Sequence, residues 1–320
     1  MGPVLVFSCE SSPEVPLAAS SAPISQIYVQ KAENASGGVL DLFFFEDEPG
    51  YVLDSYQRID AWDGSPLGGA SRSGAKVLVA FANYASDRYS YGAMNCLQTL
   101  SETAFPLWQE NPSLPMMSGV EKLEAGEDCT LNLYPSLSRI LLRSICCDFS
   151  GKPYEGETLS DVKIYLINVC SEYRPLSRES ISWINMGLFS ELDSGRLSHP
   201  EMLYSSLDGG ISSSVRYPDI SLYCYPNLIP EETMNVRFTR LVIEGTIMGQ
   251  KCYYPINVNR SGFGYISGEE GLSAAKNYLM DITLTRLGTD DPDKPVSSDM
   301  VTVRTSVLPW YDYPEYVVRY

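Results

Sequence analysis

Short apolar segments, alternating or continuous and separated by turn residues, constrain the fold of this chain most strongly. The segments with this pattern are residues 24–30, 39–47, 74–84, 162–170, 220–227, 237–259, 278–288 and 299–310. Residues 248–250 are expected to turn a hairpin within this series. Only residues 91–107 place apolar side chains at helical spacing in the N-terminal half. Strands without alternating helices predict an all-β protein built from sandwiches, with one short helix in its N-terminal part.

The length of the chain and the position of one proline indicate two domains. A chain of 320 residues can bury two separate hydrophobic cores. Pro135 interrupts an apolar run, and proline is not tolerated in the middle of a central strand. We therefore expect a tether at residues 1–23, an N-terminal sandwich at residues 24–134 and a C-terminal sandwich at residues 135–320.

The charge and the single histidine limit the chemistry of the chain. Its formal net charge of −17 disfavours binding to nucleic acid or to an anionic membrane surface. His199 is the only histidine, and no GxSxG motif or catalytic cysteine signature accompanies it. We expect a protein that is not an enzyme and has no cofactor or metal. A glycosidase, which needs only two carboxylates, ranks third among the functional hypotheses.

Three aspartates in residues 288–296 are open to two interpretations. Asp290, Asp291 and Asp293 could ligate calcium, but the segment lacks the internal glycine and distal glutamate of an EF-hand loop. Because aspartate and proline are also common turn formers, we favour a loop between two strands.

The eight cysteines favour free thiols over disulfides. Their spacing shows no repeated framework and no CxxC pair, and Cys146 and Cys147 are adjacent. Several others, such as Cys129, Cys170 and Cys252, lie inside apolar runs, where cysteine behaves as a small buried hydrophobe.

The N-terminal residues combine a short apolar run with a polar segment rich in Ser, Pro and Ala. The run ends at Ser8 and Cys9, as at the end of a bacterial lipoprotein signal, in which Cys9 becomes the lipidated residue. The alternative is an ordinary buried strand. No stretch of the chain approaches the roughly 20 apolar residues of a membrane-spanning helix.

The C-terminal residues 299–320 form two alternating segments. The residues that share a face are Val301, Val303, Thr305 and Val307 in the first segment, and Tyr316, Val318 and Tyr320 in the second. Both segments could complete the chain's own sheet. Alternatively, they could be donated to another subunit, where an added strand gains main-chain hydrogen bonds and pockets for alternate side chains.

Several segments occur in an order that is typical of one family. They are LDLFFFEDEPGYVLDSYQRI, KVLVAFAN, LYPSLSRILLRSI, VKIYLINV, TRLVIEGTIMGQKCYYPINVN, YLMDITLTRLGTDDPDKPV and VLPWYD. Together, over residues 24–320, they resemble the Bacteroidales fimbrillin superfamily, the FimA-like and related subunits of type V pili.

The resemblance implies two transthyretin-like β-sandwich domains in tandem and export with a signal peptide as a lipoprotein. It implies that Cys9 carries the lipid, such as palmitate, and anchors the chain to the outer membrane as part of a fimbria. Residues 24–30 would be a first strand that is removed by proteolysis at Lys31, where the family has an arginine. Residues 299–320 would then fill the vacated groove of a neighbouring fimbrial subunit, which is the expected partner.

The alternative function is a surface carbohydrate-binding β-sandwich protein that recognises host or bacterial ligands. The tryptophans that could stack on sugars are Trp62, Trp108, Trp183 and Trp310. Burial in the cores would explain these aromatic residues equally well.

Overall fold

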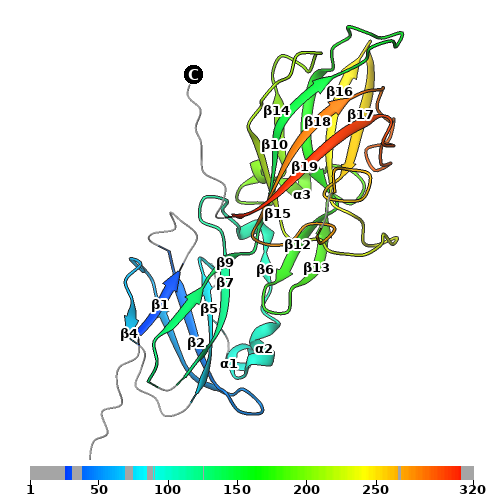
Figure 1. Cartoon of the computed structure of the whole chain (residues 1–320). Coiled ribbons are helices and arrows are strands. Elements are labelled where there is room, and N and C mark those ends of the chain that lie inside the picture. Colours follow the sequence, from blue (N-terminus) through cyan, green and yellow to red (C-terminus); the bar gives the residue numbers. More distant parts are fainter. Residues whose placement is uncertain are drawn as a thin grey trace, which may run out of the picture.

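The computed structural model describes residues 26–30, 38–68, 75–84, 89, 91–124, 126–265 and 268–310. These residues form an all-β chain with three short α-helices, which confirms the predicted fold class. Two lobes follow one another along the sequence, and each contains a pair of packed sheets (Figure 1).

The N-terminal lobe packs a five-stranded antiparallel sheet against a three-stranded sheet. The larger sheet has the order β3 (Leu53–Ile59), β2 (Leu40–Glu46), β5 (Lys76–Ala82), β7 (Met117–Leu123) and β9 (Tyr134–Pro135). The smaller sheet has the order β4 (Leu67–Gly68), β1 (Gln26–Gln30) and β8 (Cys129–Asn132).

Two adjacent inner strands of the larger sheet, β2 and β5, are buried on both faces. All seven residues of β5 are buried, as their continuous apolar run predicts. In β2, Leu42 and Phe44 contribute to the core beneath the smaller sheet, whereas Phe43 and Phe45 belong to a second core on the opposite face. This alternation follows from the period of two in a strand.

The predicted helix at residues 91–107 is wrong in length. It consists of α1 (Tyr91–Met94) and α2 (Leu97–Ser101), and the chain then becomes strand β6 (Phe105–Pro106) and the 3₁₀ turn η1 (Leu107–Gln109). Cys96 between the helices is extended, with φ of −149°. The backbone here bonds to the start of β3 instead: Leu53, its first residue, donates to the carbonyl of Asn95 at 2.9 Å. The helical spacing of apolar residues does not reveal that the backbone near Asn95 bonds to a distant strand.

The C-terminal lobe is a sandwich of two four-stranded sheets. The first has the order β15 (Ile220–Cys224), β10 (Ser138–Cys147), β18 (Lys276–Leu284) and β19 (Val301–Pro309). The second has the order β14 (Tyr204–Leu207), β11 (Ser160–Ile167), β16 (Arg240–Ile247) and β17 (Gln250–Asn257). The predicted hairpin is confirmed, because Met248 and Gly249, with φ of 52° and 77°, link β16 to β17 as a two-residue turn.

A third small sheet connects the lobes. Its order is β13 (Glu179–Ile184), β12 (Val169–Arg174) and β6. The single strand expected at residues 162–170 is two strands, β11 and β12, because Asn168 between them has a left-handed φ of 56°. The remaining helical elements are α3 (Glu191–Ser194) and the 3₁₀ turn η2 (Pro200–Met202).

The junction between the lobes is packed rather than open. One continuous hydrophobic core includes Phe43 of the first lobe, Phe105 of β6 and Tyr173 of β12, and Phe105 pairs with Tyr173 in the connecting sheet. The chain passes from β9 to β10 with only Ser136 and Leu137 between them. The two lobes are therefore firmly connected.

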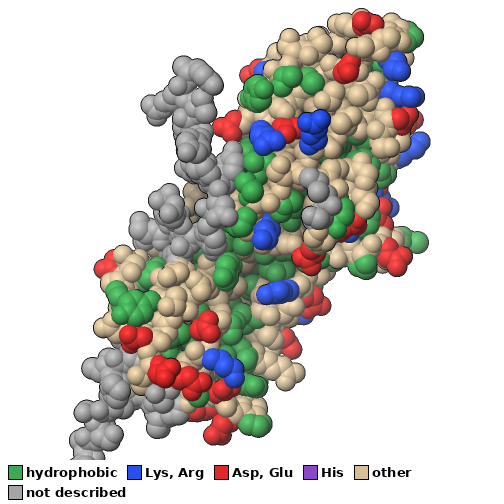
Figure 2. Space-filling model, in the orientation of Figure 1, with side chains coloured by type: hydrophobic (Ala, Val, Ile, Leu, Met, Phe, Trp, Pro, Cys, Tyr) green, Lys and Arg blue, Asp and Glu red, His purple; other side chains and the backbone are tan. Residues whose placement is uncertain are grey.

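Charged side chains of both signs are scattered over the face that Figure 2 shows. On this face, the Lys and Arg side chains form no continuous patch. Among the described residues, no helix is both long and apolar enough to cross a membrane.

Candidate assembly site

Strand β1 lies in the middle of the smaller N-terminal sheet. It pairs antiparallel with β4 on one side, through Gln26 and Ile27, and parallel with β8 on the other. Figure 1 shows this short strand at the outer side of the N-terminal lobe. Because β4 and β8 are not neighbours of each other in this sheet, β1 alone joins them.

Two side chains of β1 fix it to the core. Ile27 and Val29 are buried against the N-terminal core, whereas Gln26, Tyr28 and Gln30 point outward and are exposed. Full burial of an aliphatic side chain contributes about 1.5–3 kcal/mol. The burial of β1 therefore follows the alternation predicted from the sequence, and two of its five side chains are buried.

Main-chain contacts supply the rest of the attachment of β1. The N–H of Gln26 donates to Oδ1 of Asp128 at 2.8 Å, and the N–H of Leu133 donates to the carbonyl of Gln30 at 2.9 Å. These contacts depend on the backbone of β1 and not on its side chains. Any strand with apolar residues at two alternate positions could make the same contacts.

Strand β19 lies at the edge of the first C-terminal sheet. It pairs antiparallel with β18 along its whole length, from Val301 opposite Leu284 to Pro309 opposite Lys276. Val301 and Thr305 are buried, Val303 is half-buried and Val307 is 42% exposed. The predicted donor residues of this segment therefore have a place in the chain's own sheet.

A glycine-containing loop covers part of the outer edge of β19. A Cβ atom on Gly264 would come within 2.8 Å of the Thr305 nitrogen, so this loop approaches the strand backbone closely. The hydroxyl of Thr305 donates to the carbonyl of Phe263 at 3.5 Å. These contacts protect the middle of an edge that would otherwise be open to pairing.

The described chain ends where the lobes meet. Trp310 packs against both cores, and its N–H donates to the carbonyl of Ala275 at 2.9 Å. The other residues that the sequence singled out for assembly, namely Cys9, Lys31, Tyr316, Val318 and Tyr320, lie outside the described residues.

The aspartate-rich loop is held by arginines. Asp293 forms ion pairs with Arg237 and Arg240 and accepts a hydrogen bond from Nδ2 of Asn168 at 3.1 Å. Within the described part of the chain, no group of three or more His, Cys, Asp and Glu side chains could hold a metal ion. Through these contacts Asp293 anchors the loop to the sheet.

The remaining candidate side chains serve structural roles or lie apart. Nδ1 of His199 lies 2.8 Å from Oε1 of Glu201 at the surface. The cysteines that the structure describes are all free thiols: Cys96, Cys129, Cys146, Cys147, Cys170, Cys224 and Cys252. Of the tryptophans, Trp62 is buried in the N-terminal core and Trp108 is exposed on η1. The four tryptophans belong to separate elements and build no common sugar platform.

Sequence reasoning missed both neighbours of β1. The apolar residues of β8 were visible as the alternating Leu131 and Leu133, but nothing local shows that this strand pairs in parallel with β1. The described part of strand β4 comprises the two residues Leu67 and Gly68, which give no hydrophobic pattern. The pairing joins segments about a hundred residues apart, so only the fold reveals it.

The fold is two tandem β-sandwiches, the first with a short strand in the middle of its smaller sheet. The resemblance in the sequence is thereby confirmed at the level of the fold. A fimbrilin (FimA) from Porphyromonas gingivalis W83 superposes with a TM-score of 0.63 at 15% identity, covering 90% of this chain and 98% of that chain. No protein-family model and no curated protein matches the sequence.

Two further solved structures have the same architecture. A proposed cell adhesion protein from Bacteroides eggerthii matches with a TM-score of 0.63 and 16% identity, over 90% of this chain and 97% of that one. The tip fimbrial protein Mfa3 from Porphyromonas gingivalis, with a C-terminal truncation, matches with a TM-score of 0.51 and 12% identity, over 90% and 100% of the two chains. These identities are low, so the likeness concerns the fold.

Proposed function

We propose that the chain is a structural subunit of a cell-surface fimbria that polymerises by strand exchange and contributes to adhesion. The observation that carries the proposal is the position of β1 between β4 and β8, where only Ile27 and Val29 bind it to the core. Removing β1 would leave a groove with a strand edge on each side and an apolar floor. A strand from another subunit would restore both ladders of hydrogen bonds.

Proteolysis at Lys31 would free β1, because this residue directly follows the last residue of the strand, Gln30. A cleaved β1 is held only by its hydrogen bonds and its two apolar anchors. It can then be displaced by a strand that buries more apolar surface.

The C-terminal residues are the proposed donor, and the two halves of this segment are not equivalent. Donation of β19 would break its pairing with β18 along nine residues. Donation of residues 311–320 would leave that ladder intact. We therefore place the main contribution in the second half, where Tyr316, Val318 and Tyr320 alternate in the same way as Ile27 and Val29.

Lipidation at Cys9 would place the unprocessed chain on the outer membrane. Residues 10–23 would separate the lipid from β1, so that cleavage at Lys31 would also release the subunit from its anchor. Mass spectrometry of the surface protein tests this point. A first residue of lipid-modified Cys9 indicates an anchored form, and a first residue of Ala32 indicates a processed subunit.

Limited trypsin treatment of the purified full chain tests polymerisation directly. The parent chain should form polymers in size-exclusion chromatography and electron microscopy after cleavage. Lys31→Gln and a chain lacking residues 311–320 should both remain monomeric, whereas Lys122→Gln, a change at an exposed lysine on β7, should polymerise normally. Normal polymers from the truncated chain would exclude the donor role.

A further inference from the structure

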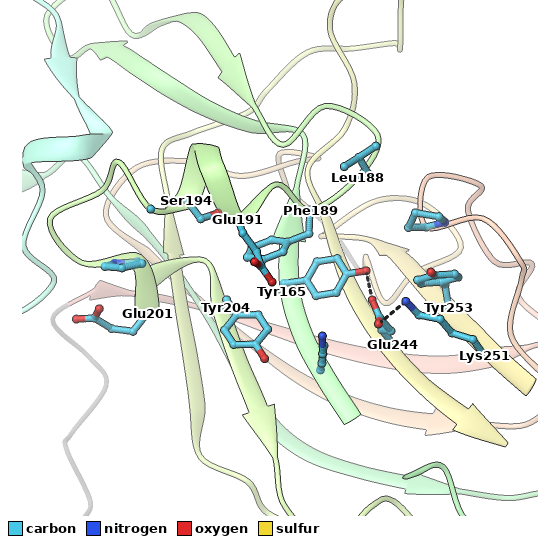
Figure 3. A pocket seen from close by; sticks show the side chains of 14 residues that line it. Tyr165, Leu188, Phe189, Glu191, Ser194, Glu201, Tyr204, Glu244, Lys251 and Tyr253 are labelled. Carbon is cyan, nitrogen blue, oxygen red and sulfur yellow. Dashed lines mark hydrogen bonds and ion pairs between the residues drawn. The ribbon is translucent and has the colours of Figure 1, made fainter. Parts of the chain in front are cut away.

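The outer face of the second C-terminal sheet carries a pocket that the assembly role does not use. Its volume is about 720 Å³, within the range of roughly 300–1,000 Å³ of small-molecule sites. Figure 3 shows its wall formed by strands β11, β14, β16 and β17, with the segment before α3 across one side. None of these elements belongs to β1, β4 or β8.

Aromatic rings form one side of this pocket. The ring centroids of Tyr165 and Phe189 are 5.0 Å apart, and those of Phe189 and Tyr204 are 5.3 Å apart with an angle of 28° between the ring planes. Tyr165 is buried, but Phe189, Tyr204 and Tyr253 are only partly buried and line the cavity. Apolar ring faces turned toward a cavity on a sheet's outer surface are a platform for a flat, partly apolar ligand.

A fixed polar network lies beside the rings. The hydroxyl of Tyr165 donates to Oε2 of Glu244 at 2.9 Å, and Nζ of Lys251 lies 2.8 Å from Oε1 of the same carboxylate (Figure 3). Burial and the carboxylate raise the pKa of Tyr165, so this hydroxyl keeps its proton and its donor role. Nζ of Lys251 also lies 5.1 Å from the centre of the Tyr253 ring.

Hydrogen-bond donors and acceptors also line the pocket beside the aromatic rings. Lys163 lines the pocket from β11, and the exposed carboxylates of Glu191 and Glu201 line it from α3 and η2. Three carboxylates and two ammonium groups line the pocket in all. Glu244 already bonds to Tyr165 and Lys251, and Lys251 compensates its negative charge. The pocket therefore has little net charge with which to attract a strongly cationic or anionic ligand.

We propose that this pocket binds a neutral pyranose sugar of a surface glycan. A pyranose ring has an apolar C–H face that stacks on tyrosine and phenylalanine, and hydroxyl groups that both donate and accept hydrogen bonds. The mixed set of ammonium and carboxylate groups suits hydroxyls better than it suits a charged group. The site is independent of the fimbrial role, since a monomer carries the complete pocket.

A glycan array with the purified full-length monomer tests the proposal. The probes are neutral gluco-, galacto- and manno-configured oligosaccharides, with sialylated and sulfated glycans and a lysine-rich peptide for comparison. We expect binding of a neutral oligosaccharide, with an affinity then measured by titration calorimetry. Binding of none of the neutral probes, or of charged probes only, would overturn the proposal.

Variants locate the binding in the pocket. Phe189→Ala and Tyr204→Ala should each weaken binding by about tenfold or more, because each removes a stacking surface. Tyr204→Phe keeps the ring and should retain most of the affinity. Tyr217→Ala, at an exposed tyrosine that does not line the pocket, is the matched control. Circular dichroism checks that each variant is folded, and unchanged affinity in folded Phe189→Ala would place the binding elsewhere.

Discussion

Replacing Glu110 by glutamine should remove a pH dependence of stability that one buried carboxyl group imposes on the chain. Glu110 follows η1 near the junction of the lobes and is completely buried. Its Oε2 accepts the N–H of Met116 at 3.0 Å, whereas Oε1 has no hydrogen-bond partner among the described residues. Burial raises the pKa of Glu110 to about 8, while the hydrogen bond from the Met116 N–H lowers it less.

The sign and size of the effect follow from this raised pKa. Below about pH 4.5 the carboxyl group is protonated in both the folded and the unfolded chain, so its contribution to stability is complete. Between about pH 4.5 and 8 only the unfolded chain releases the proton, and the free energy of unfolding falls by about 1.4 kcal/mol per pH unit. Over this interval the loss amounts to about 5 kcal/mol.

Urea unfolding followed by tryptophan fluorescence measures the effect at about pH 5.5 and pH 7.5. The glutamine of Glu110→Gln does not titrate. From about pH 5.5 to pH 7.5 the free energy of unfolding of this variant should therefore rise by about 3 kcal/mol relative to that of the parent chain. Other titrating groups are common to both chains and cancel in the difference. Glu127→Gln, at an exposed glutamate, controls for the loss of one carboxylate. Equal pH dependence in parent and Glu110→Gln would refute the reasoning.

Two further predictions concern single side chains. Ile27→Ala should lower the free energy of unfolding of the N-terminal lobe by about 3 kcal/mol through loss of a buried anchor, whereas exposed Tyr28→Ala should change it by about 0.5 kcal/mol or less in the same urea titration. Asp293→Asn should cost about 3 kcal/mol, because it removes one carboxylate partner of the buried Arg240 guanidinium. Thermal unfolding checks the second change, and a midpoint equal to that of the parent would contradict the anchoring role.

The sequence predicts those features of the fold that depend on local patterns. The continuous apolar run of β5, the alternation of β1 and the turn at Met248 and Gly249 all appear in the structure as expected. The helix at residues 91–107 is shorter because the backbone near Asn95 bonds to a distant segment. Such a bond leaves no trace in hydrophobic spacing.

The candidate sites depend on contacts that are remote in sequence. Strand β1 is flanked by β4 and β8, and the pocket collects Tyr165, Phe189 and Tyr204 from three separate segments. Local sequence fixes which face of each strand is apolar, but sheet order decides which faces meet. The burial of Glu110 also depends on contacts that are remote in sequence, because its neighbours Met116 and Tyr225 come from different lobes.

Strand exchange at the β1 groove is the central claim, and cryo-electron microscopy of polymers formed by the cleaved full chain tests it most directly. We expect a strand between β4 and β8 of each subunit that is continuous with the C-terminal residues of its neighbour, with β1 absent. Polymers in which every subunit retains residues 26–30 in this position would contradict it.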